Sequence, residues 1–322
     1  MKVLLVLLWA SCVCAGSQET GEWEQWMDAG RANLTRLDFA GAAASFQRAA
    51  NLAGSLPPEG GELVLVLNGL ATAHKQMGRL AEASREYRRA IDLSEHTRLR
   101  GTLTYSYLLA SLATVEIERR SFGQAKQMLA EAIEIDERAG SPDSVQLAIA
   151  RQLMAKVLVH DGNYEAADKL LSQAVQVFRS NPDTPPDLLP FALDNVGNLR
   201  RLQGRPEDAL AAFQQEFEAF ASAFGSDHPV IILALNNLGV QYFALGRNAE
   251  ARTSFERAVT LLDRNEKTDP ATKGHILANY AGLLRQSGDS RGARAIERRA
   301  SAIQGSLTVD VTMLGPTSFR KE

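Results

Sequence analysis

The chain has 322 residues, of which 45% are hydrophobic and 23% are charged. This composition excludes a disordered polypeptide and supplies enough apolar material for one large domain or an extended repeat array. Lys and Arg number 35 against 38 Asp and Glu, which gives a formal net charge of −3. Such a balance argues against nucleic acid or an anionic membrane surface as the partner.

The first 16 residues, MKVLLVLLWASCVCAG, are typical of a secretory signal peptide. A single cation at Lys2 precedes an apolar run over 3–10, and small residues follow up to a cleavage point after Ala15 or Gly16. The apolar run is too short for a permanent span of the bilayer, and no later segment is long and apolar enough to cross one. We therefore expect an exported protein, either periplasmic or secreted.

A lipid anchor at Cys12 is the alternative reading of this leader. Lipoprotein signals usually carry Leu or another aliphatic residue three positions before the modified cysteine, where this chain has Trp9. This difference disfavours lipidation. Both cysteines of the chain, Cys12 and Cys14, lie in the leader. The mature protein would then enter an oxidising compartment without disulfides, so its stability must come from packing.

Residues 17–303 carry an internal repeat with a period of 42 residues. Three columns of small residues and one column of turn residues keep this register. The first column comprises Ala71, Ala113, Ala155, Gly197, Gly239 and Ala281. The second comprises Ala83, Ala125, Ala167, Ala209, Ala251 and Ala293, and the third comprises Ala90, Ala132, Ala174, Ala258 and Ala300, with Glu216 as its exception. The turn column comprises Gly78, Arg120, Gly162, Gly204, Gly246 and Gly288.

Each unit reads as two amphipathic helices joined by a tight turn. In one unit, apolar residues recur at helical spacing from Leu235 to Tyr242, the turn falls at Gly246, and a second apolar series begins at Phe255. A glycine inside a helix costs about 1 kcal/mol relative to alanine, so Gly239 needs a reason. We predict that the small residues lie where the paired helices cross, because larger side chains would push the axes beyond the usual 8–10 Å.

These columns resemble the tetratricopeptide repeat family. The first unit fits through Trp26, Gly30 and Phe46, with alanines at 42 and 49, and the period together with GSDHPVIILALNNLG over 225–239 is similar to the kinesin light chain subclass. The resemblance covers about residues 22–303. It implies an all-α, right-handed superhelical solenoid of about seven antiparallel helical hairpins. Departures from the family pattern are Arg120 in the turn column, and Glu116 and Glu297 at packing positions.

Residues 304–322 follow a different pattern. Apolar and polar residues alternate in SLTVDVTML, which is the period of a strand rather than of a helix. We expect a short tail that is disordered or forms a single strand.

The sequence offers no pattern for catalysis, a metal or a cofactor. Its five histidines are scattered over five units, and it has no HExxH, GxSxG or phosphate-binding glycine loop. We therefore expect neither an enzyme nor a metal or cofactor site, and a hydrolase is the least favoured class.

The first helices of the hairpins carry rows of polar residues on the face that would point into the groove of the solenoid. Asparagine is a poor helix former in mid-helix, so its accumulation there favours a binding role. The family resemblance implies that such rows hold an extended peptide through amides and cations. The candidate groove residues are Asn68, Lys75, Gln152, Lys156, Asp194, Asn198, Arg201, Asn236 and Phe243.

The sequence thus predicts an exported, non-enzymatic scaffold that binds a protein or peptide segment in its concave groove. We expect a monomer that binds no nucleic acid. The alternative is a structural or assembly element of an envelope complex, or a solenoid that associates with itself. The final unit carries Glu297, Arg298 and Arg299, and this polarity favours a cap over open-ended stacking.

Overall fold

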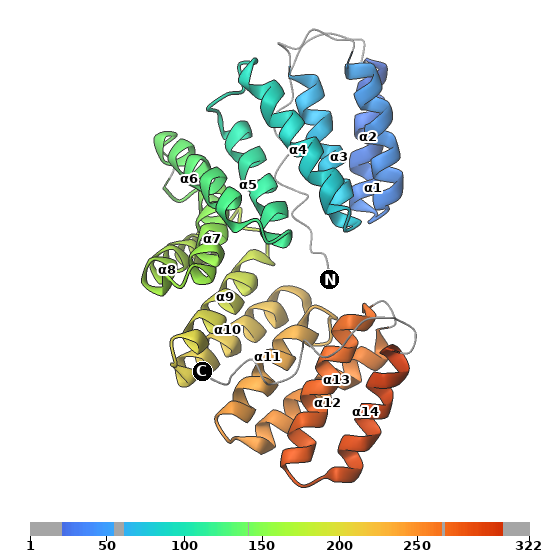
Figure 1. Cartoon of the computed structure of the whole chain (residues 1–322), viewed down its shortest axis with the longest axis vertical. Helices are drawn as coiled ribbons and strands as arrows, with labels where there is room; N and C mark the ends of the chain where they lie inside the picture. The colour runs from blue at the N-terminus through green and yellow to red at the C-terminus, as the bar shows by residue number, and fades with distance from the viewer. Residues whose placement is uncertain (1–20, 55–60, 141, 266–267, 305–322) are drawn as a thin grey trace. The chain divides into compact units, whose positions relative to one another are not determined.

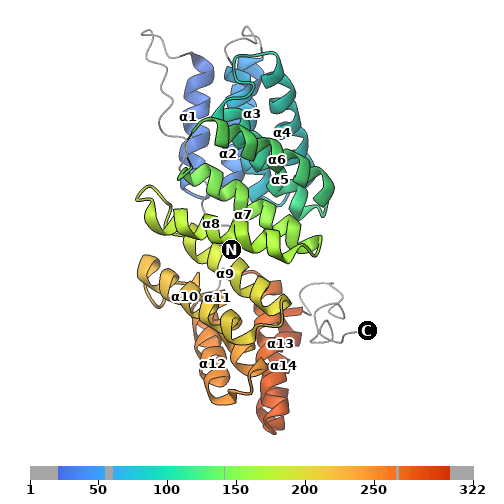
Figure 2. The same cartoon turned by 90° about the vertical axis from the view of Figure 1, so that its left-hand side faces the viewer.

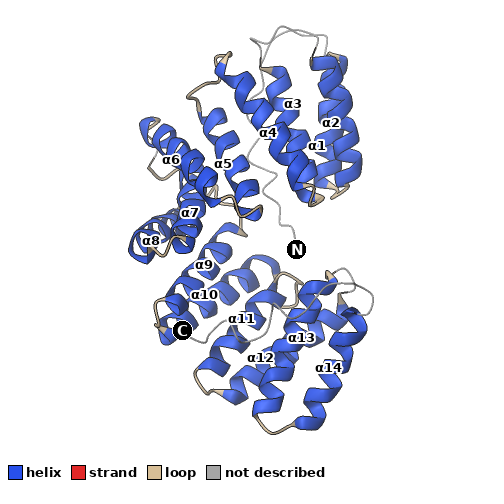
Figure 3. Cartoon of the chain, in the orientation of Figure 1, coloured by secondary structure: helices blue, strands red, loops and turns tan. Residues whose placement is uncertain are grey.

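The computed structural model describes residues 21–54, 61–140, 142–265 and 268–304, which form fourteen α-helices and no strand (Figure 3). The predicted signal peptide and residues 305–322 of the predicted C-terminal tail lie outside these residues, whereas Gln304 ends the last helix. None of the described helices is long and apolar enough to cross a bilayer.

The helices belong to two compact units that divide between Asp183 and Thr184. The N-terminal unit contains α1 (Glu22–Thr35), α2 (Phe39–Ala53), α3 (Glu62–Gln76), α4 (Leu80–Glu95), α5 (Leu103–Glu118), α6 (Phe122–Arg138), α7 (Val145–His160) and α8 (Tyr164–Ser180). The C-terminal unit contains α9 (Leu188–Leu202), α10 (Pro206–Phe224), α11 (Ile231–Ala244), α12 (Asn248–Arg264), α13 (Pro270–Gln286) and α14 (Ser290–Gln304).

Each odd-numbered helix pairs with the helix that follows it, which gives seven hairpins among the described residues (Figures 1 and 2). This confirms the predicted helical hairpins. A residue in the left-handed conformation closes the turn of every hairpin, usually a glycine, such as Gly246 with φ of 73°. Arg120 and Leu37 adopt the same conformation with φ of 62°, although a Cβ makes it unfavourable. The turn geometry is therefore imposed by the hairpin and not by glycine.

The small residues of the first column lie at the crossings, as predicted. A Cβ added to Gly239 would lie 2.8 Å from the ring of Phe255, and one added to Gly197 would lie 2.5 Å from the ring of Phe213. Real Cβ atoms essentially never approach other heavy atoms this closely. The phenylalanine of the second helix therefore occupies the space that a side chain on the first helix would need.

The crossing position of each hairpin holds either glycine or alanine. Glycine stands opposite phenylalanine, as in the pairs just described and in Gly30 with Phe46. Alanine stands at the same spacing from other residues, which include Leu129 opposite Ala113 and Tyr87 opposite Ala71. All of these residues are buried. The glycine penalty is thus offset by a large aromatic ring packed against the bare backbone.

The apolar core continues from one hairpin to the next within each unit. One cluster in the N-terminal unit joins Leu67 of α3, Tyr87 of α4 and Leu108 of α5, so it spans two hairpins. Such stacking buries the face that a single hairpin would leave exposed. It also places the odd-numbered helices beside one another, and α5 contacts α7 directly.

Candidate peptide-binding face

An open pocket lies in the N-terminal unit across the first helices of three successive hairpins. It encloses about 460 Å³, including solvent at its open side. The lining residues are Lys75 of α3, Tyr107, Ala110, Ser111 and Thr114 of α5, and Gln146, Ile149 and Leu153 of α7. The pocket therefore exists only because the hairpins stack.

Helical spacing explains why these residues share one face. On α5, Ala110 and Ser111 lie three and four residues after Tyr107 and four and three before Thr114, and the α7 residues from Gln146 to Leu153 are spaced by three and four. Residues at these intervals form a single stripe on a helix. The stripe on α5 differs from the one that meets α6, where Ala113 lies at the crossing.

The pocket combines apolar surface with neutral and cationic hydrogen-bonding groups. Ala110, Ile149 and Leu153 are apolar, whereas Lys75 supplies a cation. Burial raises the pKa of the Tyr107 phenol, so this group is a neutral hydroxyl at physiological pH. A few polar groups around an apolar surface are typical of ligand sites, since the apolar part supplies affinity and the polar part orientation.

Of the predicted groove residues in this unit, the pocket contains Lys75. Asn68 is only 7% exposed, and its Oδ1 atom finds no hydrogen-bond partner among the described residues. Gln152 is half-buried and Lys156 is exposed, and neither lines the pocket.

The polar rows of the C-terminal unit form contacts between helices. Asp194 of α9 accepts hydrogen bonds from Asn198 one turn later (3.0 Å) and from Asn237 of α11 (2.9 Å). The same Asn237 Nδ2 lies 3.3 Å from Oε2 of Glu216 on α10. Asn237 therefore joins carboxylates from two different helices.

A second amide contact continues the row. Asn236 is 5% exposed, and its Oδ1 accepts a hydrogen bond of 2.9 Å from Asn279 of α13. Burial lowers the pKa of Arg201, an effect that the charge of Asp194 opposes. Phe243 is half-buried beside the apolar cluster of α11 to α14. Asp194 and Asn236 thus bond side chains of the neighbouring first helix, whereas Asn198 bonds within α9.

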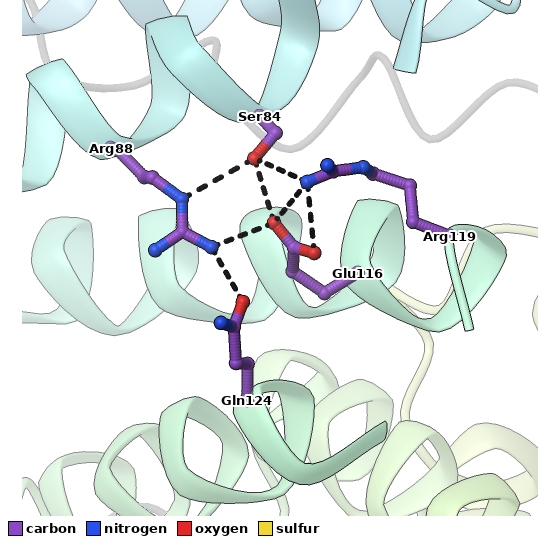
Figure 4. A network of polar contacts seen from close by, with 5 residues as sticks. All are labelled: Ser84, Arg88, Glu116, Arg119 and Gln124. Atoms are coloured by element: carbon purple, nitrogen blue, oxygen red, sulfur yellow. Dashed lines mark hydrogen bonds and ion pairs between the residues drawn. The ribbon is translucent and has the colours of Figure 1, made fainter. Parts of the chain in front are cut away.

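A buried carboxylate between two arginines joins α4, α5 and α6 in the N-terminal unit (Figure 4). Glu116 of α5 is fully buried, and its Oε1 accepts hydrogen bonds from Ser84 (2.7 Å) and Arg88 (2.9 Å) of α4. Arg119 donates to both carboxylate oxygens, at 3.0 and 3.1 Å. Arg88 also donates to Gln124 of α6 at 2.7 Å.

The surroundings of Glu116 keep it ionised. Burial acts to raise its pKa, but the hydrogen bonds from Ser84 and Arg88 and the charges of both arginines outweigh burial and lower it. The side chains of Arg88 and Arg119 remain 42% and 39% exposed. Because Ser84 and both arginines donate to the carboxylate, this network links the α3–α4 hairpin to the α5–α6 hairpin.

Comparison with known families agrees with this architecture. The model of the MalT-like TPR region matches residues 26–192, and a tetratricopeptide repeat model matches residues 189–264 and 231–306. The chain belongs to the tetratricopeptide repeat family. The family model thus confirms the resemblance drawn from the alanine and glycine columns.

Solved structures of other tetratricopeptide repeat proteins share the fold of this one. The apo form of RapI is 12% identical with a TM-score of 0.67, covering 89% of this chain and 99% of that one. A Rap protein complexed with competence and sporulation factor is 14% identical with a TM-score of 0.64, covering 90% and 88%. Kinesin light chain repeats from Podospora anserina are 16% identical with a TM-score of 0.53, covering 63% and 95%. No curated protein sequence matches the chain.

Sequence reasoning missed most of the pocket of this tetratricopeptide repeat protein. Ala110 and Thr114 occupy the same columns as the predicted residues at 68, 152 and 156, so the 42-residue register could have found them. Tyr107, Ile149 and Leu153 lie in neighbouring columns that mix apolar and polar residues. Such columns read as core, and only the packing of three helices shows that they border a pocket.

Proposed function

We propose that this protein is a non-enzymatic scaffold that binds an extended segment of another protein across α3, α5 and α7. The observation that carries the proposal is the pocket on the first helices, with Lys75 beside apolar Ile149 and Leu153. Stacked hairpins hold these groups in place before the partner arrives, so the partner bears most of the ordering cost. The net charge of −3 supports a protein partner over a nucleic acid.

Two of the structural neighbours support a recognition role. One is a Rap protein complexed with competence and sporulation factor, and another is the apo form of the quorum sensor NprR from Bacillus thuringiensis, with a TM-score of 0.61. Both share the arrangement of helical hairpins with this chain. A scaffold that recognises a partner without making or breaking a bond fits this fold.

The last hairpin supports a monomer over a self-stacking array. Glu297 of α14 stands where α10 and α12 carry Phe213 and Phe255, and it forms an ion pair with Arg285 of α13. A charged pair at the packing position of a terminal repeat keeps that end soluble.

A library of random 12-residue peptides displayed on phage tests the proposal. Peptides selected on the wild-type chain are expected to lose affinity by about tenfold or more in Ile149→Trp, because the indole fills the pocket. Fluorescence anisotropy with one labelled selected peptide measures the change. Gln127→Trp, at an exposed position of α6, is the matched control and should bind like the wild type.

Circular dichroism and thermal melting establish that both variants keep their fold. Equal binding by Ile149→Trp, or an equal loss in Gln127→Trp, would place recognition elsewhere. Failure of the library to yield any binder for the wild type would overturn the proposal as well.

We also propose that the protein is exported, on the basis of its first 16 residues. The single cation and the apolar run of MKVLLVLLWASCVCAG support this proposal. Mass spectrometry of the protein isolated from its native host is expected to find a mature chain that begins at residue 16 or 17. A chain that retains Met1, or that begins with a lipidated Cys12, would contradict release by simple cleavage.

A further inference from the structure

Glu216 occupies a position of the 42-residue repeat that is alanine in the other repeats of the column. It lies on α10, at the spacing of Ala174 and Ala258, and only 2% of its surface is exposed. A carboxyl group in such a place is costly when ionised unless a cation or several donors compensate its charge. The polar surroundings of Glu216 therefore decide its state.

The group that faces Glu216 from α9 is another carboxylate. Asn237 Nδ2 lies 2.9 Å from Oδ1 of Asp194 and 3.3 Å from Oε2 of Glu216, so the two carboxyl groups share one amide donor and lie close together. From α11, this neutral amide is the polar group that contacts Glu216. Arg201 of α9 acts on Asp194, and the nearby contact between Gln214 and Tyr242 is uncharged.

The same residue type meets the opposite environment in the N-terminal unit. Glu116 is also buried, but Arg88 and Arg119 both donate to its carboxylate. Glu216 has one shared amide and a like charge instead. Two buried carboxyl groups that share one amide donor cannot both ionise cheaply. Asp194 also accepts a hydrogen bond from Asn198 and lies in the field of Arg201, so its anion is the better stabilised and Glu216 keeps the proton.

We propose that Glu216 and Asp194 hold one proton between them beside Asn237, and that loss of this proton as the pH rises loosens the packing of α10 against α9 and α11. This device goes beyond partner binding by the N-terminal unit. Asp194 and Asn237 belong to the polar rows of the first helices, so loss of the proton changes the face that these helices present.

The sign of the effect follows from the shift in pKa. Burial, and then the charge of Asp194, raise the pKa of Glu216 well above its ordinary value, and the hydrogen bond from Asn237 opposes them. Above the ordinary value near 4.5 the unfolded chain releases the proton while the folded chain retains it. The contribution of this group to stability is therefore fully present below the unfolded pKa and is lost as the pH rises through the folded pKa.

Urea unfolding of the full chain between pH 5 and 8.5 tests the proposal. Relative to Glu216→Gln, the wild type is expected to lose stability as the pH rises, by up to about tenfold in the unfolding equilibrium constant per pH unit. Glu218→Gln, at an exposed position of the same helix, is the matched control and should follow the wild type. Parallel pH profiles for the wild type and Glu216→Gln would overturn the proposal.

Carbon-13 NMR of the Glu216 carboxyl in the wild-type chain gives an answer that does not depend on how the variants fold. The carboxyl resonance is expected to titrate well above pH 4.5, and Asp194→Asn should move the midpoint down because it removes the like charge. A wild-type midpoint near 4.5 refutes the shared proton. Hydrogen exchange, corrected for its intrinsic pH dependence, should show loss of protection in α9 to α11, and a uniform loss over all helices contradicts the local loosening.

Discussion

Leucine in place of Gly197 is expected to lower the free energy of unfolding of the C-terminal unit by about 3 kcal/mol, through overpacking. A Cβ at this position would meet the Phe213 ring at 2.5 Å, and the longer side chain has no other direction inside the α9–α10 crossing. The helices must separate or the ring must leave its position. Urea denaturation followed by circular dichroism measures the loss.

A double-mutant cycle assigns this loss to the ring. Phe213→Ala alone should cost about 3–5 kcal/mol through the cavity it leaves, whereas the combination with Gly197→Leu should cost clearly less than the sum. Gly282→Leu is the control, because a Cβ there meets nothing within 4 Å, and its effect should stay below about 1 kcal/mol. Strict additivity of the two changes would refute the proposed contact between the leucine and the ring.

Removal of both arginines around Glu116 is expected to have a comparable or larger effect. The double variant Arg88→Met, Arg119→Met leaves a fully buried carboxylate with Ser84 as its remaining donor in the network, at a cost of about 3–5 kcal/mol near pH 7. In the wild type the pKa of Glu116 is lower in the folded than in the unfolded chain. Its contribution to the free energy of unfolding is therefore present above the unfolded pKa and is lost as the pH falls through the folded pKa. The variant reverses this shift, so its deficit should shrink as the solution is acidified. Urea titrations at pH 4.5 and 7 measure both effects.

Replacement of Glu116 itself removes the buried charge together with its ion pairs, so it measures the net contribution of the whole network to stability. Glu116→Leu introduces the residue that this column carries at Leu158 and Leu284, and the half-exposed guanidinium groups can turn to water. We expect its stability to lie within about 1 kcal/mol of the wild type. If Glu116→Leu proved as unstable as the double arginine variant, the ion pairs would contribute more to stability than the burial of the carboxylate costs.

The fold could be predicted from the sequence because the decisive contacts are local and repeated. The crossing residues recur every 42 positions, and each meets a partner on the next helix of its own hairpin. Arg120 departed from the glycine of the turn column, yet its hairpin closes in the same left-handed conformation. Interactions spread over a whole hairpin outweigh the preference of one residue.

The two buried glutamates show where sequence reasoning ends. Glu116 and Glu216 both stood out as departures from the repeat pattern, which treats them alike. Their opposite pKa shifts depend on which side chains reach them from helices 20 to 30 residues away, arginine in one case and aspartate in the other. Periodicity fixes the register of a helix, whereas long side chains choose partners according to packing.

The proposed pocket lies on first helices, where the sequence predicts the groove, but it shares few residues with the predicted set. The first helices were the expected place, and Lys75 borders the pocket. Asn236, one of the predicted groove residues, accepts a hydrogen bond from Asn279 of the neighbouring first helix, and the adjacent Asn237 donates one to Asp194. A polar row on a helix face looks the same in the sequence whether it serves a ligand or the next helix.

The pairing of glycine with phenylalanine has a consequence for how such a chain can evolve. In the hairpins of α9–α10 and α11–α12 both members of the pair lie in one 42-residue repeat, only 16 positions apart. A tandem duplication of one repeat copies the glycine together with its phenylalanine, and a deletion of one repeat removes both residues together. Arrays built this way can change their number of repeats in single steps, while divergence at either position is constrained by its companion.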